Sequence, residues 1–173
     1  IAPNTTSTAM IQHTDMMSTF AALINYKMNN TIGEDSFNVL PSLLGKEQLS
    51  PREALVTQSS KGTIAIQKGN WKLIMCSGSG GHWTKPYGEY PKLVTTEQGP
   101  EWLNIQLYNL KNDLAETTNV AKENRDIVNE LANQLGHYII NGRSRSGKPQ
   151  TKNIELWDQV RWVQDLKLTK TNN

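Results

Sequence analysis

The stretch from Lys61 to Cys76 limits the fold more than any other part of this chain, because it holds two β-strand patterns around a tight turn. Residues 63–67 place isoleucines at alternate positions, which is the period of a half-buried strand. The pair Gly69-Asn70 follows, and both residues tolerate the positive φ of a hairpin turn. Residues 71–76 are dense in strand-forming side chains. The stretch therefore predicts a β-hairpin.

Two more strands and one long loop are expected around this hairpin. Residues 54–58 and 105–109 carry strand-forming patterns on either side of it. Residues 77–103 hold five glycines and three prolines, and this composition predicts a long loop. A loop of this length inside a small domain is usually functional or disordered.

The strongest helical pattern covers residues 124–141, where Asn124 suits the N-cap and Gly142 suits the stop. Its apolar stripe consists of Ile127, Val128, Leu131, Leu135, Tyr138 and Ile139. A first helix is expected over about residues 10–26, and a single helical turn over 39–44. The predicted fold class is α+β: a four-stranded antiparallel sheet with the long amphipathic helix packed across one face.

Two apolar segments outside this sheet need a covering surface. Residues 154–168 are too apolar for a free tail, so we expect them to pack back on the body as a strand or a short helix. In the first helix, Phe20, Leu23 and Ile24 lie on one face. If the partner of that face is missing, these side chains are expected to be exposed, disordered or buried against a second copy.

Composition and charge exclude several classes of function. The chain has 173 residues, enough for one ordinary domain or for a small domain plus a fragment of another. Its net charge is +2 with 20% charged residues, which gives no electrostatic case for nucleic acid or a membrane surface. No run of about 18 apolar residues occurs, so no membrane span is predicted. Cys76 is the single cysteine, so no disulfide forms within the chain, and this suits a cytosolic or a periplasmic protein alike.

No catalytic motif occurs in the chain. It has no nucleophile elbow, no HExxH motif and no paired-cysteine metal site. The three histidines lie far apart in sequence, at positions 13, 82 and 137. His13 and His137 are interpreted as structural. The segment 113–119 is interpreted as a turn in which Asp, Thr and Asn side chains accept backbone hydrogen bonds.

The glycine-rich segment 76–83 has two interpretations. It is either a flexible surface loop or a loop that lines a pocket. In the second interpretation, His82 and Lys85 contact anionic or hydroxylated groups and Trp83 stacks on a sugar ring. It is not a nucleotide-binding loop of the Walker type, because no GK[ST] follows the glycines.

Four motifs occur in an order that resembles the C-terminal part of the formylglycine-dependent sulfatases, the arylsulfatase-like branch of the alkaline-phosphatase superfamily. They are HTDMMSTFAAL from His13, DSFNVLPSLLGK from Asp35, AIQKGNWKLI from Ala65 and LYNLKNDLAETTNVA from Leu107. The tetrapeptide NGRS at 141–144 also fits, and the resemblance covers about residues 1–146. One departure is Leu114, which stands where the family has proline in a D-P-x-E turn.

The resemblance implies three parts: a terminal piece of the sulfatase α/β core at 1–32, a sulfatase C-terminal subdomain at 33–146 and a C-terminal extension at 147–173. In the family, a cysteine or serine within C/S-x-P-x-R becomes formylglycine, whose hydrate attacks sulfur, and a calcium ion stabilises the charge. That motif and the calcium-binding Asp-Asp pair do not occur in this chain. The resemblance therefore implies a chain that is inactive alone, with no catalytic residue, metal ligand or cofactor of its own.

The resemblance also implies where substrate and partners meet the chain. The family's C-terminal module borders the active-site cleft, and by that analogy the rim contacts are Gln58, Lys61, His82, Trp83 and Lys85. The implied partners are the N-terminal catalytic part of the sulfatase and a sulfated substrate, with self-association through the first helix as a further option. A periplasmic or secreted location is favoured over a cytoplasmic one.

Two other interpretations stay open. One is a non-catalytic module that binds glycans or another partner through the tryptophan-containing loop. The other is one product of a cleaved sulfatase that stays bound to its amino-terminal product.

Overall fold

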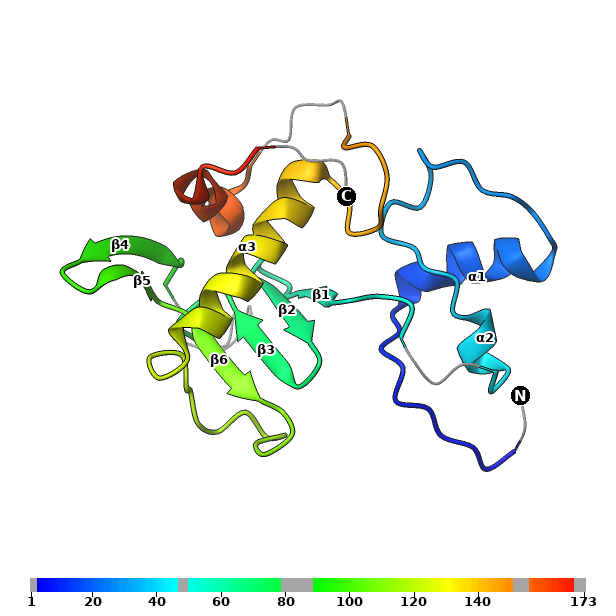
Figure 1. Cartoon of the computed structure of the whole chain (residues 1–173), viewed down its shortest axis with the longest axis horizontal. Coiled ribbons are helices and arrows are strands. Elements are labelled where there is room, and N and C mark those ends of the chain that lie inside the picture. The colour runs from blue at the N-terminus through cyan, green and yellow to red at the C-terminus, as the bar shows by residue number, and fades with distance from the viewer. Residues whose placement is uncertain (1–2, 47–49, 79–88, 151–155, 170–173) are drawn as a thin grey trace. The chain divides into compact units, whose positions relative to one another are not determined.

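The structure, a computed structural model, describes residues 3–46, 50–78, 89–150 and 156–169 (Figure 1). The chain forms two compact units. The α1 unit consists of residues 1–55, 141–152 and 170–173, and the sheet unit consists of residues 56–140 and 153–169. This division follows compactness, whereas the boundaries expected at residues 32 and 146 concern family membership and stay a prediction.

The sheet unit is built on four strands in the order β1-β2-β3-β6, and the four strands expected from the sequence are confirmed. Their bounds are Leu55–Gln58 for β1, Ile64–Lys68 for β2, Trp71–Ile74 for β3 and Gln106–Asn109 for β6. β3 pairs antiparallel with β2 and with β6. The register places Ile66, Leu73 and Leu107 side by side, so these fully buried side chains share one face of the sheet.

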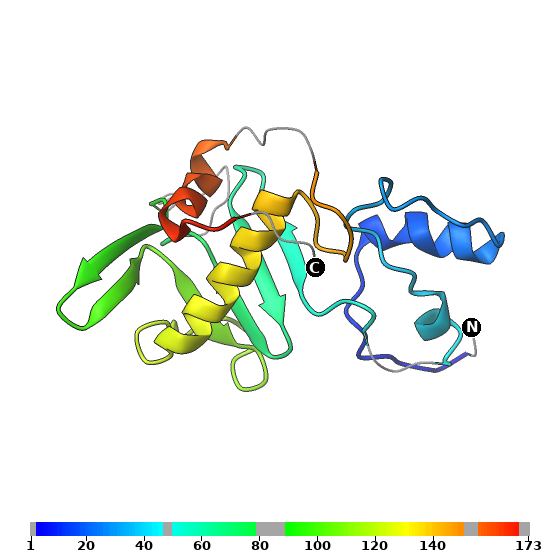
Figure 2. The same ribbon diagram turned by 45° about the horizontal axis from the view of Figure 1, so that its top comes forward.

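The helix α3, Arg125–Asn141, lies over this sheet in both views of the chain (Figures 1 and 2). Its buried residues recur at helical spacing and face the core of the sheet unit. They include Val128, Leu131, Ala132 and Leu135. The core of the sheet unit therefore lies between one face of α3 and the row of apolar side chains on the central strands.

The prediction of a loop over residues 77–103, of which residues 79–88 lie outside the described residues, was wrong for residues 92–103. A second, two-stranded sheet is formed there by β4, Lys92–Thr96, and β5, Gly99–Leu103. The glycine and proline content of this region obscured the strand pattern in the sequence. In the structure, Gly99 adopts a φ of +101° next to the turn. Pro100 is compatible with β5 because this strand is paired with β4 in a two-stranded ribbon, where an edge position does not need every backbone N–H. An isolated hairpin is marginal in water, so this ribbon needs tertiary support.

The C-terminal segment provides that support. Residues 158–166 form the 3-10 helix η2, in which Val160, Trp162 and Val163 are buried. Trp162 meets Trp102 of β5 edge to face, with ring centroids 5.4 Å apart. Of the two outcomes expected for residues 154–168, a strand or a short helix, the described part of the segment shows a short helix.

The last residue of η2 and Leu168 just beyond it approach α3 at a glycine. A Cβ atom on Gly136 would lie 2.7 Å from Leu168 Cδ1 and 2.8 Å from Leu166 Cδ1. The absence of a side chain at this position therefore lets the C-terminal segment close onto the helix.

The α1 unit has short helices: η1 at His13–Asp15, α1 at Met16–Leu23 and α2 at Leu40–Leu43. The helix expected over residues 10–26 is therefore shorter than its apolar pattern indicated. Its polar side is buried, whereas Phe20, Leu23 and Ile24 are 59%, 62% and 73% exposed. Of the outcomes expected for this face, the chain shows exposure.

Hydrogen bonds fix the polar side of α1 against residues 36–39. The backbone N–H of Ser18 donates to Ser36 Oγ at 2.8 Å, and the Ser18 hydroxyl donates to the Ser36 carbonyl at 2.9 Å. Thr19 Oγ1 accepts from the backbone N–H of Val39 at 3.1 Å. Buried polar groups need such partners, so these bonds determine which side of the helix faces inward.

A buried arginine organises the segment that follows α3. The Arg143 guanidinium donates to the backbone carbonyls of Asn30, Arg145, Ser146 and Lys148, at 2.7 to 3.2 Å. The neighbouring Ser144 N–H donates to a carboxylate oxygen of Asp35 at 2.8 Å. The NGRS and DSFNVLPSLLGK motifs therefore meet in space. None of the helices in the described ranges combines the length and apolar character needed to cross a membrane.

Candidate functional site

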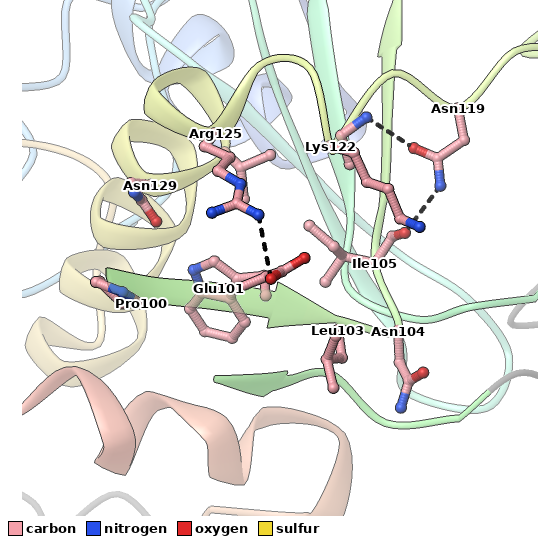
Figure 3. A pocket seen from close by; sticks show the side chains of 12 residues that line it. Pro100, Glu101, Leu103, Asn104, Ile105, Asn119, Lys122, Arg125 and Asn129 are labelled. Carbon is pink, nitrogen blue, oxygen red and sulfur yellow. Dashed lines mark hydrogen bonds and ion pairs between the residues drawn. The ribbon is translucent and has the colours of Figure 1, made fainter. Parts of the chain in front are cut away.

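A pocket in the sheet unit lies where β5, the connection to β6 and the start of α3 converge (Figure 3). The polar residues that matter most in its lining are Glu101, Asn119, Lys122, Arg125 and Asn129. Apolar side chains, including those of Leu103 and Val128, complete its walls. The pocket thus combines a small apolar surface with several groups that can bind oxygen-rich ligands.

Local hydrogen bonds build this pocket. The Asn119 carboxamide oxygen accepts from the backbone N–H groups of Leu107 and Ala121, at 3.0 and 3.1 Å. Its nitrogen donates to the Ile105 carbonyl at 3.0 Å. Asn119 therefore joins the start of β6 to the segment that leads into α3. Its carboxamide provides one hydrogen-bond acceptor and one donor to the backbone, as a peptide group of a neighbouring strand would.

The charged side chains that line the pocket are two cations and one carboxylate, and the carboxylate forms an ion pair with one of the cations. Arg125 Nη2 lies 3.1 Å from Glu101 Oε2, and Figure 3 shows the two side chains directed toward each other. Lys122 adds a second cation from the residues that precede α3. The described lining thus offers one carboxylate, two cations and several carboxamides, which are groups that hydrogen-bond to oxygen-rich ligands.

The residues predicted at the substrate rim do not line this pocket. Gln58 ends β1 and Lys61 lies in the turn before β2, and both are exposed. The Lys61 carbonyl accepts from Gln159 Nε2, and the next carbonyl, of Gly62, accepts from Trp157 Nε1 at 3.2 Å. The other predicted contacts, His82, Trp83 and Lys85, lie outside the described residues. The rim therefore stays a prediction.

The side chain of Cys76 lies in the interior of the sheet unit, two residues after the end of β3. The residue is buried, and its thiol donates to the Gly78 carbonyl at 3.0 Å. Burial raises the pKa of the Cys76 thiol by removing the thiolate from water, and this outweighs the opposing hydrogen bonds. Within the described ranges, no group of three or more His, Cys, Asp or Glu side chains could hold a metal ion.

The Asp113 turn has the structural role expected from the sequence. The backbone N–H groups of Thr117 and Thr118 both donate to the Asp113 carboxylate, at 2.9 to 3.0 Å. These hydrogen bonds lower the pKa of Asp113 below its ordinary value of 3.8, the bond from Thr117 being the largest cause. Leu114, at the family's proline position, is exposed to solvent.

This pKa gives a pH prediction for the turn. A carboxylate whose folded-state pKa is lowered stabilises the fold above its unfolded-state pKa, and this contribution is lost as pH falls through the folded-state value. We expect the Thr117 and Thr118 amide resonances to shift together in an NMR titration, with a midpoint below 3.8. Asp113→Asn should abolish that titration, and a midpoint at or above 3.8 would contradict the assignment.

The chain matches known sulfatases over most of its length, although no protein-family profile matches it. It is 35% identical over 129 residues to an N-acetylgalactosamine-6-O-sulfatase of Bacteroides thetaiotaomicron, covering 73% of this chain and 23% of that protein. A solved structure, BT33336S-sulf, comes from work on the metabolism of multiple glycosaminoglycans by Bacteroides thetaiotaomicron. It is 33% identical to this chain, and the two structures superpose with a TM-score of 0.53. The match covers 70% of this chain and 23% of that one.

A weaker match is the structure of Ps i-CgsB in complex with k-i-k-neocarrahexaose. It is 21% identical with a TM-score of 0.47 and covers 79% of this chain and 26% of that one, which is too distant to define a function. The similarity to the Bacteroides proteins confirms the resemblance read from the motifs: the chain corresponds to a sulfatase C-terminal region. It spans about a quarter of the length of the relatives it matches.

Proposed function

We propose that this chain is the C-terminal portion of a sulfatase that hydrolyses aryl or carbohydrate sulfate esters. The observation that carries the proposal is the 35% identity over 129 residues to an N-acetylgalactosamine-6-O-sulfatase. Because the relative is much longer than the matched region, the reacting groups belong to the rest of the enzyme. By family resemblance these are the formylglycine nucleophile and a calcium ion.

In this proposal the chain shapes the substrate cleft and does not carry the chemistry. Residues 1–32 end the catalytic core, residues 33–146 form the C-terminal subdomain and residues 147–173 extend it. The proposed rim contacts are Gln58, Lys61, His82, Trp83 and Lys85. The exposure of Gln58 and Lys61 supports this role, since contacts with substrate need accessible side chains.

The name of the relative suggests a first substrate to assay. A sulfate at the 6-position of N-acetylgalactosamine is the group that this relative's name specifies. We propose a sulfated sugar of this class for the complete enzyme, together with a periplasmic or secreted location, where such polymers are met.

The proposal predicts a division of activity that kinetics can measure. The isolated 173-residue chain should not turn over an aryl sulfate or a 6-sulfated N-acetylgalactosamine. In the complete enzyme, His82→Ala with Trp83→Ala should raise KM by about tenfold or change the preference among sulfated sugars, because the two removed contacts together contribute about 1.4 kcal/mol to binding.

Leu114→Ala is a matched control for these kinetics, because Leu114 is exposed and outside the proposed rim. It should leave KM and kcat unchanged. Turnover by the isolated chain would contradict the proposal of an inactive portion. Unchanged kinetics of the double variant across several substrates would contradict the proposed rim.

The pocket at the start of α3 favours a second candidate function, a non-catalytic glycan-binding module. Lys122, Arg125 and the carboxamide of Asn129 are groups that bind sulfate and hydroxyl oxygens. The same assay separates the candidates: a complete polypeptide that binds sulfated oligosaccharides without hydrolysing any sulfate ester would favour the module.

A further inference from the structure

Trp157 is an exposed tryptophan that the fold holds in place. It is 43% exposed, whereas Trp102 and Trp162 of the same unit are buried. Its Nε1–H group donates to the Gly62 carbonyl at 3.2 Å, and Gln159 Nε2 donates to the carbonyl of the preceding residue in the same turn. The polar edge of the indole is therefore satisfied within the protein, and the exposed part of the side chain belongs to its apolar ring.

The turn before β2 is shaped to receive this ring. Gly62 has a φ of +83°, a conformation that favours glycine. A Cβ atom at Gly62 would lie 3.1 Å from Trp157 Nε1, so a larger residue would push the indole away from its carbonyl partner. The fixed position matters for binding, because a side chain that is already ordered loses little freedom when a ligand arrives.

The surroundings of Trp157 are polar and include a cation. Gln58 ends β1, Lys61 lies in the turn that follows, and both are exposed. The carboxylate of the next residue, Asp158, is compensated by Arg161 at 2.7 Å. An aromatic ring among carboxamide and ammonium groups matches a sulfated sugar, which offers an apolar ring face, hydroxyl groups and a negative charge. An apolar protein surface would instead bury these polar groups without partners.

We propose that Trp157 stacks against a sugar ring of a sulfated oligosaccharide while Lys61 binds a sulfate group of the same ligand. This inference rests on the proposed function, and it adds to the rim a residue of the C-terminal extension. Trp157 presents an open surface and does not line the pocket described above. An open surface contacts one face of a sugar within a longer chain, whereas a site that encloses a single sugar needs walls around it. The sugar held by Trp157 is therefore a neighbour of the one that loses sulfate.

NMR of the 173-residue chain tests the binding directly. The probe is a tetrasaccharide that contains 6-sulfated N-acetylgalactosamine, added up to about 10 mM. The indole N–H signal of Trp157, assigned by its loss in Trp157→Phe, should shift and saturate, while that of buried Trp162 stays in place. The desulfated tetrasaccharide should bind several-fold more weakly. A Trp157 signal that does not respond, or that responds equally to inorganic sulfate alone, would overturn the inference.

Kinetics of the complete enzyme give a second measurement. Trp157→Ala should raise KM for the tetrasaccharide about tenfold and leave KM for the 6-sulfated monosaccharide and kcat unchanged, because only the longer substrate reaches the ring. Trp157→Phe keeps an aromatic ring and should recover part of the loss. Leu114→Ala, at an exposed residue of the same unit, should change neither substrate's KM. Equal changes for the two substrates, or none for either, would contradict the assignment to a neighbouring sugar.

The outcomes separate this inference from the proposed function. A complete polypeptide that hydrolyses no sulfate ester, in a chain whose Trp157 signal still responds to the tetrasaccharide, would sink the proposed function and keep the binding site. Turnover that is indifferent to Trp157→Ala would sink the site alone. Hydroxyl-radical labelling of Trp157 that is already low in the complete enzyme without ligand would show that protein covers the ring, and it would overturn the proposal.

Discussion

Asp15→Ala is expected to unfold the α1 unit while the sheet unit stays folded. The Asp15 and Arg52 side chains are 0% and 1% exposed, and they form an ion pair. Removal of one member of a buried pair leaves the other charge without a partner, which costs about 3–5 kcal/mol. The variant also removes the acceptor of the Phe37 and Gln12 backbone N–H groups.

Two probes distinguish the units in this experiment. All five tryptophans fall in the residue ranges of the sheet unit, so tryptophan fluorescence reports that unit. Hydrogen exchange of the amides of residues 15–23 reports the α1 unit. We expect fast exchange in Asp15→Ala with an unchanged fluorescence transition.

Two further variants serve as controls for the pair. Asp15→Asn keeps an oxygen acceptor for the backbone N–H groups and should lose less stability than Asp15→Ala. Asp15→Leu combined with Arg52→Leu leaves no buried charge and should recover part of the loss. If Asp15→Ala costs less than about 1 kcal/mol, the pair behaves like a solvated one and does not hold the α1 unit together.

Trp162→Ala is expected to cost the sheet unit about 3–5 kcal/mol, the usual range for removal of a buried tryptophan. Trp162 is buried, its ring meets that of Trp102, and its Nε1 donates to the Gln159 carbonyl at 3.0 Å. Its loss should release the C-terminal segment and the β4–β5 ribbon together. Urea unfolding followed by far-UV circular dichroism measures the change in the free energy of unfolding.

Trp157→Ala is the matched control, because Trp157 is 43% exposed and belongs to the same segment. It should cost about 1 kcal/mol or less, through loss of the hydrogen bond from Trp157 Nε1 to the Gly62 carbonyl. Equal losses of unfolding free energy in the two variants would show that buried Trp162 packs no more tightly than exposed Trp157. That result would contradict its assignment as part of the sheet unit.

Local patterns predicted the regular elements of the sheet unit well. Alternation in residues 63–67 and the Gly69-Asn70 turn specify a hairpin from neighbours in sequence alone. The stripe in residues 124–141 likewise specifies a helix from its own period. In the β4–β5 ribbon, by contrast, glycine and proline obscured the strand signal, and the pairing depends on a contact between Trp102 and the distant Trp162.

The candidate pocket could not be predicted for a related reason. Its residues come from a strand that the sequence did not reveal and from the start of a helix whose polar positions resemble an ordinary solvated surface. Asn119 carried a signal as a turn residue, but its bonds to the start of β6 depend on tertiary contacts. The predicted rim at Gln58 and Lys61 came from family resemblance and not from any local pattern.

The amino-acid order of this chain is sufficient for the hairpin, the long helix and the sulfatase motifs, because these depend on periodicity and turn chemistry over short distances. It also shows that α1 has one apolar side. The direction of that side follows from contacts between residues far apart in sequence. The Asp15 carboxylate needs Arg52, and Ser18 and Thr19 need residues 36–39, so the polar side turns inward and the apolar side is left exposed.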